Sequence, residues 1–421
     1  MKRGAIAEIA AVGVIIHVAT AMLRLDAFWP YPKQLDFVCD YVGAWAIRVG
    51  VSPYQPPPEF LATLRANTAL ALDLPFLASA PIVPWLVQPF TFVNYPAAAT
   101  AWLLLSLGLT AWSARELARI ADTKHTWAVF VLVLTFGPVF LTLTLGQNSL
   151  FLLVAVLAVA QALKTPTPRA TMRAALLFVP PVGFKLFPLL WLGALPLLQR
   201  WRLLLSTTTI LITAFGISTA LTPTASREYW GDLLPLRLTG YLHQPTVDDQ
   251  SLTAWFERIG RPQELDIQGL SVDQLQHTSW SPPWSVDRDI LRGAAIVLSI
   301  GIGALVSVVM WRTPAAASDG AFYLWVLCGL VAIPHAQRYD HVVMLPAMAW
   351  LWARGGTARR STIIAYTLAG FARLTHLWAL LPAPWGPLAS GVGLASVLVL
   401  GTAMLINLRR GDPPIDTLPS F

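Results

Sequence analysis

The stretch AIAEIAAVGVIIHVATAM, residues 5–22, decides the fold, because eighteen predominantly apolar residues are about what one helical membrane crossing needs. The stretch DFVCDYVGAWAIRVGVSPY, residues 36–54, follows where this first span leaves the bilayer. It places Asp36 and Asp40 four residues apart. Two interpretations stand at this point: acids on the wet face of an interfacial helix, or the catalytic acid of a membrane enzyme. The spacing alone favours the first.

The composition excludes a soluble protein. Of 421 residues, 56% are hydrophobic and only 12% are charged, and the mean hydropathy is +0.59. We therefore predict an all-α polytopic membrane protein of about twelve helices. The expected spans are roughly 5–23, 97–117, 126–145, 149–164, 172–183, 186–199, 203–222, 290–311, 320–334, 340–354, 361–382 and 388–407.

The distribution of charge predicts the topology. The net charge of +7 does not indicate a nucleic-acid partner, because most Lys and Arg residues lie at helix ends. Short connectors on one side are rich in basic residues, among them Arg115, Arg119 and Lys124, so we assign that side to the cytoplasm. Both termini are then cytoplasmic, and the N-terminal apolar segment is read as a retained span rather than a cleaved signal.

Two long segments, about 24–96 and 223–289, are expected to face outward from a single membrane domain. The first contains an expected short helix over residues 59–72 and a proline-punctuated apolar piece over 80–92. The second contains four tryptophans suited to the membrane interface, for which simple anchoring is the favoured interpretation.

The candidate site residues are the polar side chains in these outer segments or near the outer ends of spans. They are Asp36 and Asp40; Gln147 and Asn148; Lys185; His243, Asp249 and Gln250; His335, Arg338, Tyr339, Asp340 and His341; and Arg373. Lys185 and Arg373 interrupt apolar runs, where a charge is costly unless it is paired or reaches the headgroups. Gln147 and Asn148 follow a glycine, so their amides have the alternative of satisfying a turn.

These residues suggest an outward-facing cavity with acids at one end and cations near the membrane boundary. Such a cavity suits a lipid-linked phosphate donor, whose leaving group the cations hold while a carboxylate takes a proton from an incoming hydroxyl. No metal is expected, since His335 and His341 with one acid form no recognised ligand spacing. No nucleotide signature is present, and no cofactor is expected.

The ordered motifs resemble glycosyltransferase family 87. This family comprises polyprenyl-phosphate-sugar-dependent enzymes of the GT-C fold and includes mycobacterial mannosyltransferases that act on phosphatidylinositol mannosides. The matching residues lie in the family's order: Asp36, Phe37, Tyr41, Gly50, Pro53 and Tyr54; Gly146, Gln147 and Asn148; Lys185 shortly before Pro188; Gln250, Ser251 and Leu252; and Tyr339 and Asp340. Two departures are Asp40, where the family usually has tyrosine, and Ser79 with Ala80 before Pro81.

The resemblance implies a bacterial plasma-membrane enzyme that moves a hexose, mannose first, from a polyprenyl-phosphate donor to a lipid or glycolipid hydroxyl, with inversion. Asp36 is then the general base. Lys185, Arg338 and Arg373 contact the donor phosphate. The remaining residues that contact substrate are Asp40, Tyr41, Tyr54, Gln147, Asn148, His243, Gln250, His335, Tyr339, Asp340 and His341.

The alternative is a twelve-span transporter or flippase of an anionic or lipid-linked substrate, with the intramembrane cations as its binding groups. Transporters place their polar residues near the bilayer midplane on broken helices, whereas here they gather at the outer ends of the predicted spans. This placement favours the transferase.

Overall fold

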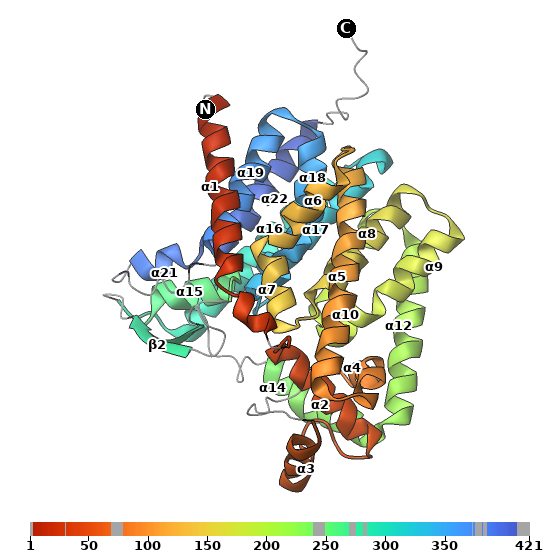
Figure 1. Ribbon diagram of the computed structural model, residues 1–421. Coiled ribbons are helices and arrows are strands. Elements are labelled where there is room, and N and C mark those ends of the chain that lie inside the picture. The colour runs from red at the N-terminus through yellow and green to blue at the C-terminus, as the bar shows by residue number, and fades with distance from the viewer. Residues whose placement is uncertain are drawn as a thin grey trace.

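Long apolar helices form the framework of the molecule (Figure 1). The computed structural model describes residues 3–29, 31–68, 79–238, 249–268, 275–280, 284–372, 374, 381 and 385–410. Within these residues, six helices are long and apolar enough to cross a membrane. They are α1 (Arg3–Met22), α5 (Tyr95–Ile120), α12 (Trp201–Leu221), α16 (Arg288–Trp311), α17 (Ser318–Ala332, preceded by η5, Ala315–Ala317) and α22 (Val392–Arg410). The prediction of a helical polytopic membrane protein is confirmed.

The other predicted spans coincide with shorter or broken helices. α6 (Thr126–Thr135) and α7 (Gly137–Leu145) form one apolar pair bent by 65°, which would make a seventh span. The remaining elements are α8 (Ser149–Lys164), α9 (Pro168–Leu177), α10 (Val179–Phe184), η3 (Phe187–Gly193), α11 (Ala194–Leu197), η6 (Arg338–Val343), α18 (Met344–Ala353) and α19 (Gly356–Phe371). Length and composition therefore support six or seven spans in the described residues, and the predicted count of twelve is not confirmed.

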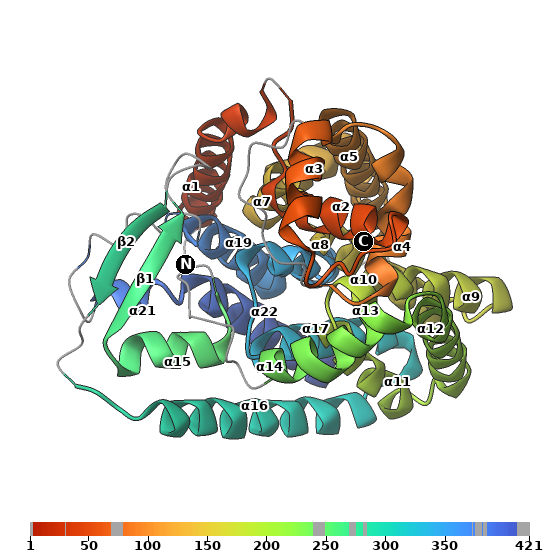
Figure 2. The ribbon, with the colours of Figure 1, turned by 90° about the horizontal axis from the view of Figure 1, so that it is seen from below.

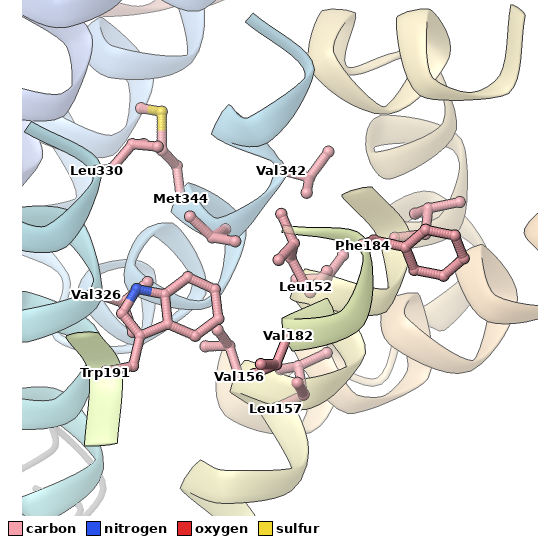
Figure 3. Close-up of a cluster of buried hydrophobic side chains, with 14 of the residues drawn as sticks. Leu152, Val156, Leu157, Val182, Phe184, Trp191, Val326, Leu330, Val342 and Met344 are labelled. Carbon is pink, nitrogen blue, oxygen red and sulfur yellow. The ribbon is translucent and has the colours of Figure 1, made fainter. Parts of the chain in front are cut away.

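The packed core surrounds α8 and α17, most of whose side chains are buried. Figure 3 shows Leu152 and Val156 of α8, Val326 of α17 and Met344 of α18 gathered around the Trp191 ring. In a bilayer, close packing rather than hydrophobic transfer drives helix association, so small residues at crossings matter. At Gly320, an added Cβ would lie 2.2 Å from the Trp350 ring, so this crossing requires glycine.

The first long segment folds into short helices: η1 (Leu25–Phe28), α2 (Leu35–Arg48), α3 (Pro58–Thr68), α4 (Ile82–Val87) and η2 (Gln88–Phe92). α2 packs against α4 and η2, as the view in Figure 2 shows for α2 and α4. Asp36 in the first turn of α2 and Arg48 in its last turn complement the helix dipole. The predicted helix over 59–72 corresponds to α3, and the apolar piece over 80–92 corresponds to α4 and η2.

The second long segment contains α13 (Pro223–Arg227), the π-helical η4 (Glu228–Leu233), α14 (Leu234–Leu238) and α15 (Leu252–Gly260). It also contains an antiparallel hairpin that the sequence did not lead us to expect, formed by β1 (Gln263–Gln268) and β2 (Leu275–Trp280) in the register Gln263 opposite Trp280. The hairpin lies near α15 and α21 (Trp385–Ala389) (Figure 2). Two short strands of mixed polarity carry little periodic signal, which explains why they were not predicted.

Candidate active site

Asp36 lies at the start of α2, just after a strained residue. Gln34, the residue before the helix, adopts the left-handed conformation (φ 45°) although it is not glycine, and it is fully buried. The Asp36 carboxylate accepts a hydrogen bond of 2.6 Å from the side-chain amide of Gln147. The acid at the start of α2 is thus held by the Gly-Gln-Asn turn, more than a hundred residues away in sequence.

Gly146 allows this turn to approach α2. It ends α7 with φ 71°, and a Cβ there would lie 2.6 Å from Cβ of Gln34 and 2.8 Å from Cβ of Phe37. Trp102 of α5 donates its indole N–H to the Gly146 carbonyl at 2.9 Å. Only glycine meets both the backbone conformation and the close contact.

We expect Gly146→Ala to lower the free energy of unfolding by about 1–3 kcal/mol and to lower activity further than the lost stability explains. The added methyl group must push α2 away from the turn and so separate Gln147 from Asp36. Thermal unfolding and transfer assays measure the two effects. Gly50→Ala is the matched control, because Gly50 has a similar φ of 78° with nothing within 4 Å of the added Cβ. Equal activity in both variants would contradict the account.

Asp40 lies one turn further along α2 and has different partners. Its carboxylate accepts a hydrogen bond of 2.9 Å from the Ser79 hydroxyl, and the nearby Asn148 side chain favours its ionised form. Tyr54 donates its hydroxyl to the Ser79 carbonyl at 2.9 Å. Gln147 and Asn148, adjacent in sequence, therefore each act on one carboxylate of the pair. The sequence motif that suggested a simple turn thus acts on both acids.

The two carboxylates differ in their titration. Burial raises the pKa of Asp36, while the Gln147 bond and the Lys185 charge partly oppose this rise. Burial also raises the pKa of Asp40, to about 7, and the neighbouring Asp36 charge adds to this rise against the Ser79 bond. The Lys185 charge favours the ionised form of both carboxylates, while Gln147 acts on Asp36 and Ser79 on Asp40.

Gln147→Ala should move the acid limb of the pH–rate profile to higher pH. A base must be ionised to act, so activity is present above the Asp36 pKa and is lost as pH falls through it. Removing the amide that stabilises the carboxylate should raise that pKa further, because the ionised form loses a hydrogen bond. Initial rates from pH 4 to pH 8 give the limb. Asn148→Ala, which removes a partner of Asp40 instead, should leave the limb in place; an unmoved limb in Gln147→Ala would contradict this role.

Lys185 follows α10 and is the cation of the site. Its ammonium forms an ion pair with Asp340, donates to the Ser149 hydroxyl at 3.2 Å and lies 4.3 Å from the centre of the Tyr339 ring. The lysine side chain is 17% exposed and that of Asp340 is 3% exposed, so the lysine is closer to the surface than the carboxylate with which it pairs. Ser149 also donates to Asp340 at 2.9 Å.

A second polar cluster borders this ion pair. The His335 Nδ1 donates to the Asp249 carboxylate at 2.6 Å, and its Nε2 contacts the Gln337 amide at 3.0 Å. Burial lowers the pKa of His335, but the Asp249 carboxylate more than offsets this and leaves the pKa above its usual value. The charges of Asp340 and Lys185 both influence the pKa of His335, so this cluster and the ion pair are neighbours.

Arg258 of α15 binds Asp249, the partner of this histidine. It is fully buried, donates to the Asp249 carbonyl at 2.6 Å and to the Ser390 hydroxyl at 2.9 Å. Burial raises the pKa of Asp249, yet His335, the Ser251 N–H and Arg258 together hold it below its usual value. Sequence reasoning did not identify Arg258, Ser149 or Gln337. A polar residue in an amphipathic helix or at a helix start carries no signal of its own.

Several predicted site residues make contacts elsewhere. Arg338 is buried and donates to the Ala372 carbonyl at 3.0 Å, and Gln250 accepts from the Gly393 N–H at 3.1 Å. The Tyr41 hydroxyl donates to the Val93 carbonyl at 2.8 Å. Burial lowers the pKa of His341 to about 4, so its ring is neutral. His243 and Arg373 lie outside the described residues.

Comparison with known proteins places the chain in a family. The sequence model of glycosyltransferase family 87 matches residues 80–334, which include Gln147, Asn148, Lys185 and Asp249. Asp36 and Asp340 lie on either side of the matched region. No curated protein and no solved structure matches the chain. The match spans more than half of the sequence, and the structure independently has the apolar helices of a multi-pass membrane protein. The chain therefore belongs to glycosyltransferase family 87.

Proposed function

We propose that this membrane glycosyltransferase moves a hexose, mannose first, from a polyprenyl-phosphate donor to a hydroxyl of a lipid or glycolipid. The observation that carries the proposal is that one short stretch contacts both a carboxylate and a cation: Gln147 donates to Asp36 at 2.6 Å, and Lys185 donates to Ser149 at 3.2 Å. The Lys185 charge also partly opposes the rise that burial causes in the pKa of Asp36. A base and a cation at one site are what displacement of a phosphate requires.

The proposed reaction is a single inverting displacement. The acceptor oxygen attacks the anomeric carbon while its O–H bond breaks and the proton passes to a carboxylate oxygen of Asp36. The bond between the anomeric carbon and the phosphate oxygen breaks on the opposite face, and its electron pair leaves with the polyprenyl phosphate. A phosphate needs charge stabilisation rather than protonation as it leaves. Gln147 keeps Asp36 oriented throughout through its 2.6 Å bond.

Lys185 provides the charge for the leaving phosphate. In the absence of donor its ammonium is paired with Asp340, so donor binding replaces or shares that partner. The Tyr339 ring below the ammonium fixes its direction. The Asp249 carboxylate raises the pKa of His335 and so favours the protonated ring. His335 borders the ion pair of Lys185 with Asp340 and orients the donor. Arg338 and Arg373 remain proposed as further contacts for the donor phosphate.

The other proposed contacts define the walls of the substrate pocket. Tyr41 and Tyr54 are buried, and their hydroxyls donate to backbone carbonyls, so we propose that they support the pocket wall. Asp40 and Asn148 border the base. His243, Gln250 and His341 complete the set of proposed substrate-binding residues. We further propose that the protein lies in a bacterial plasma membrane, with the site facing outward and both chain termini on the cytoplasmic side. Residues 24–96 and 223–289 are then the outward segments of one GT-C domain.

A donor panel tests the function. Purified protein in liposomes is incubated with polyprenyl-phosphate-mannose, or its glucose and arabinose analogues, together with a membrane lipid extract, and the lipids are analysed for a new glycolipid. We expect a product with at least one donor, mannose first. No product with any donor, together with solute flux in the same liposomes, would contradict the proposal and indicate a transporter.

A further inference from the structure

The bend between α6 and α7 lies at the start of the helix that ends next to Gln147, the residue that contacts Asp36. α6 ends at Thr135, Phe136 has an extended backbone (ψ 122°), and α7 starts at Gly137 with Pro138 behind it. A proline ring at this point prevents the helix from continuing straight. The Gly137 N–H is one of the first N–H groups of α7, which have no partner within their own helix.

His17 of α1 satisfies that N–H. Its Nδ1 accepts from the Gly137 N–H at 2.9 Å, and its Nε2 donates to the Tyr366 carbonyl of α19 at 3.0 Å. One neutral imidazole thus links three helices, as acceptor on one edge and donor on the other. The ring is fully buried between Phe136 and Tyr366, with centroid distances of 5.5 Å and 4.3 Å.

Because α7 is a single helix, the position of Gly137 at its start determines where its other end lies relative to Asp36. All nine of its residues, Gly137–Leu145, are buried, so the helix has no freedom to pivot independently of its surroundings. Gly146 and Gln147 follow its last residue, and the Gln147 amide holds Asp36. α1 also contacts α6, α7 and α19 (Figure 1), so the first span is the natural support for this bend.

We propose that His17 is a positioning residue: its contact with the Gly137 N–H holds α7 at the tilt that brings Gln147 to Asp36. This inference rests on the proposed role of Asp36 as base. It assigns a function to a buried histidine of the first span that otherwise counts as ordinary packing. Among the described residues, the titratable and charged groups that interact with Asp36 are Cys39 and Asp40 on α2, Tyr95 on α5 and Lys185.

Two polar substitutions separate positioning from packing. In His17→Asn the amide oxygen takes the place of Nδ1 and retains the acceptor for Gly137. In His17→Gln the longer amide reaches the place of Nε2 and retains only the contact with Tyr366. Both side chains are neutral, polar and smaller than the imidazole ring. If His17 had only a packing role, the two substitutions would therefore change the pH–rate profile in the same way.

The experiment is the pH–rate profile of each variant in the glycolipid assay. We expect His17→Gln to move the acid limb upward by an amount similar to Gln147→Ala and to reduce kcat about 10-fold to 100-fold, since small displacements of a catalytic group have effects of this size. His17→Asn should keep the wild-type limb. Combining His17→Gln with Gln147→Ala should move the limb no further than Gln147→Ala alone, because the first change acts through the second residue.

Thr367→Val is the matched control. Thr367 of α19 donates to the Ile9 carbonyl of α1 at 3.1 Å, so this variant weakens the same helix contact without touching Gly137. The acid limb of its pH–rate profile should stay at the wild-type pH. Equal limbs in His17→Asn and His17→Gln, or additive shifts in the combined variant, would overturn the inference even if Asp36→Asn is inactive. Wild-type transfer by Asp36→Asn would instead overturn the proposed base, so the two failures are distinguishable.

Discussion

Asp36→Asn should lose about 100-fold to 10,000-fold in the rate of sugar transfer, the range expected when a general base is removed. Asparagine has the shape of aspartate and still contacts Gln147, but its amide cannot take the proton of the acceptor hydroxyl. The position in the first turn of α2 tolerates asparagine well, so the fold should persist. Initial rates at saturating donor measure the loss.

Asp40→Asn is the matched control for this variant. It removes the same charge one turn along the same helix, from a carboxylate whose partners are Ser79 and Asn148. We expect it to lose less than about 10-fold, because Asp40 does not receive the proton in the proposed reaction. Donor binding, measured with a labelled polyprenyl-phosphate sugar, should persist in both variants. Wild-type turnover in Asp36→Asn would contradict the assignment, and a larger loss in Asp40→Asn would exchange the roles of the two acids.

Lys185→Met should lower both transfer and stability. The leaving phosphate loses its stabilising cation, which we expect to reduce kcat about 100-fold to 1,000-fold. The buried Asp340 carboxylate also loses its partner, which is expected to lower the free energy of unfolding by about 3–5 kcal/mol, as when one half of a buried ion pair is removed. Transfer rates and thermal unfolding in the same detergent measure the two losses.

A double variant separates the two consequences. Lys185→Met with Asp340→Asn removes the unpaired charge as well, so it should recover most of the lost stability. It should not recover transfer, since no cation remains for the phosphate. Recovery of both properties would show that Lys185 acts only through the ion pair with Asp340 and would contradict its role at the donor.

Composition and apolar periodicity were sufficient to predict the membrane class and the positions of the long helices. α5, α12, α16 and α22 lie close to their expected ranges, because some twenty apolar residues in a row have few other structures open to them. The bend at Gly137 was not predicted. The run 126–145 is apolar throughout, and what breaks it is the combination of Pro138 with a histidine from another helix.

The sequence selected residues that the structure brings together, but it did not predict how they contact one another. Asp36, Asp40, Gln147, Asn148, Lys185, His335, Tyr339 and Asp340 lie in two neighbouring clusters, as their outer positions led us to expect. The individual pairings depend on tertiary geometry, such as the contact of Gly146 with Gln34, and no local pattern encodes them. Arg258 is the clearest case. A fully buried arginine looks, in sequence, like any charged residue of an amphipathic helix.

The anomeric configuration of the product tests the central claim most directly, namely that Asp36 activates the acceptor for one displacement at the anomeric carbon. Purified enzyme is given a polyprenyl-phosphate sugar of known configuration, and the glycolipid is analysed by NMR before any other enzyme acts on it. We expect complete inversion, with product formed about 100-fold to 10,000-fold more slowly when Asp36→Asn replaces the wild type. Retention of configuration would exclude a single displacement from the opposite face and would contradict the proposed mechanism.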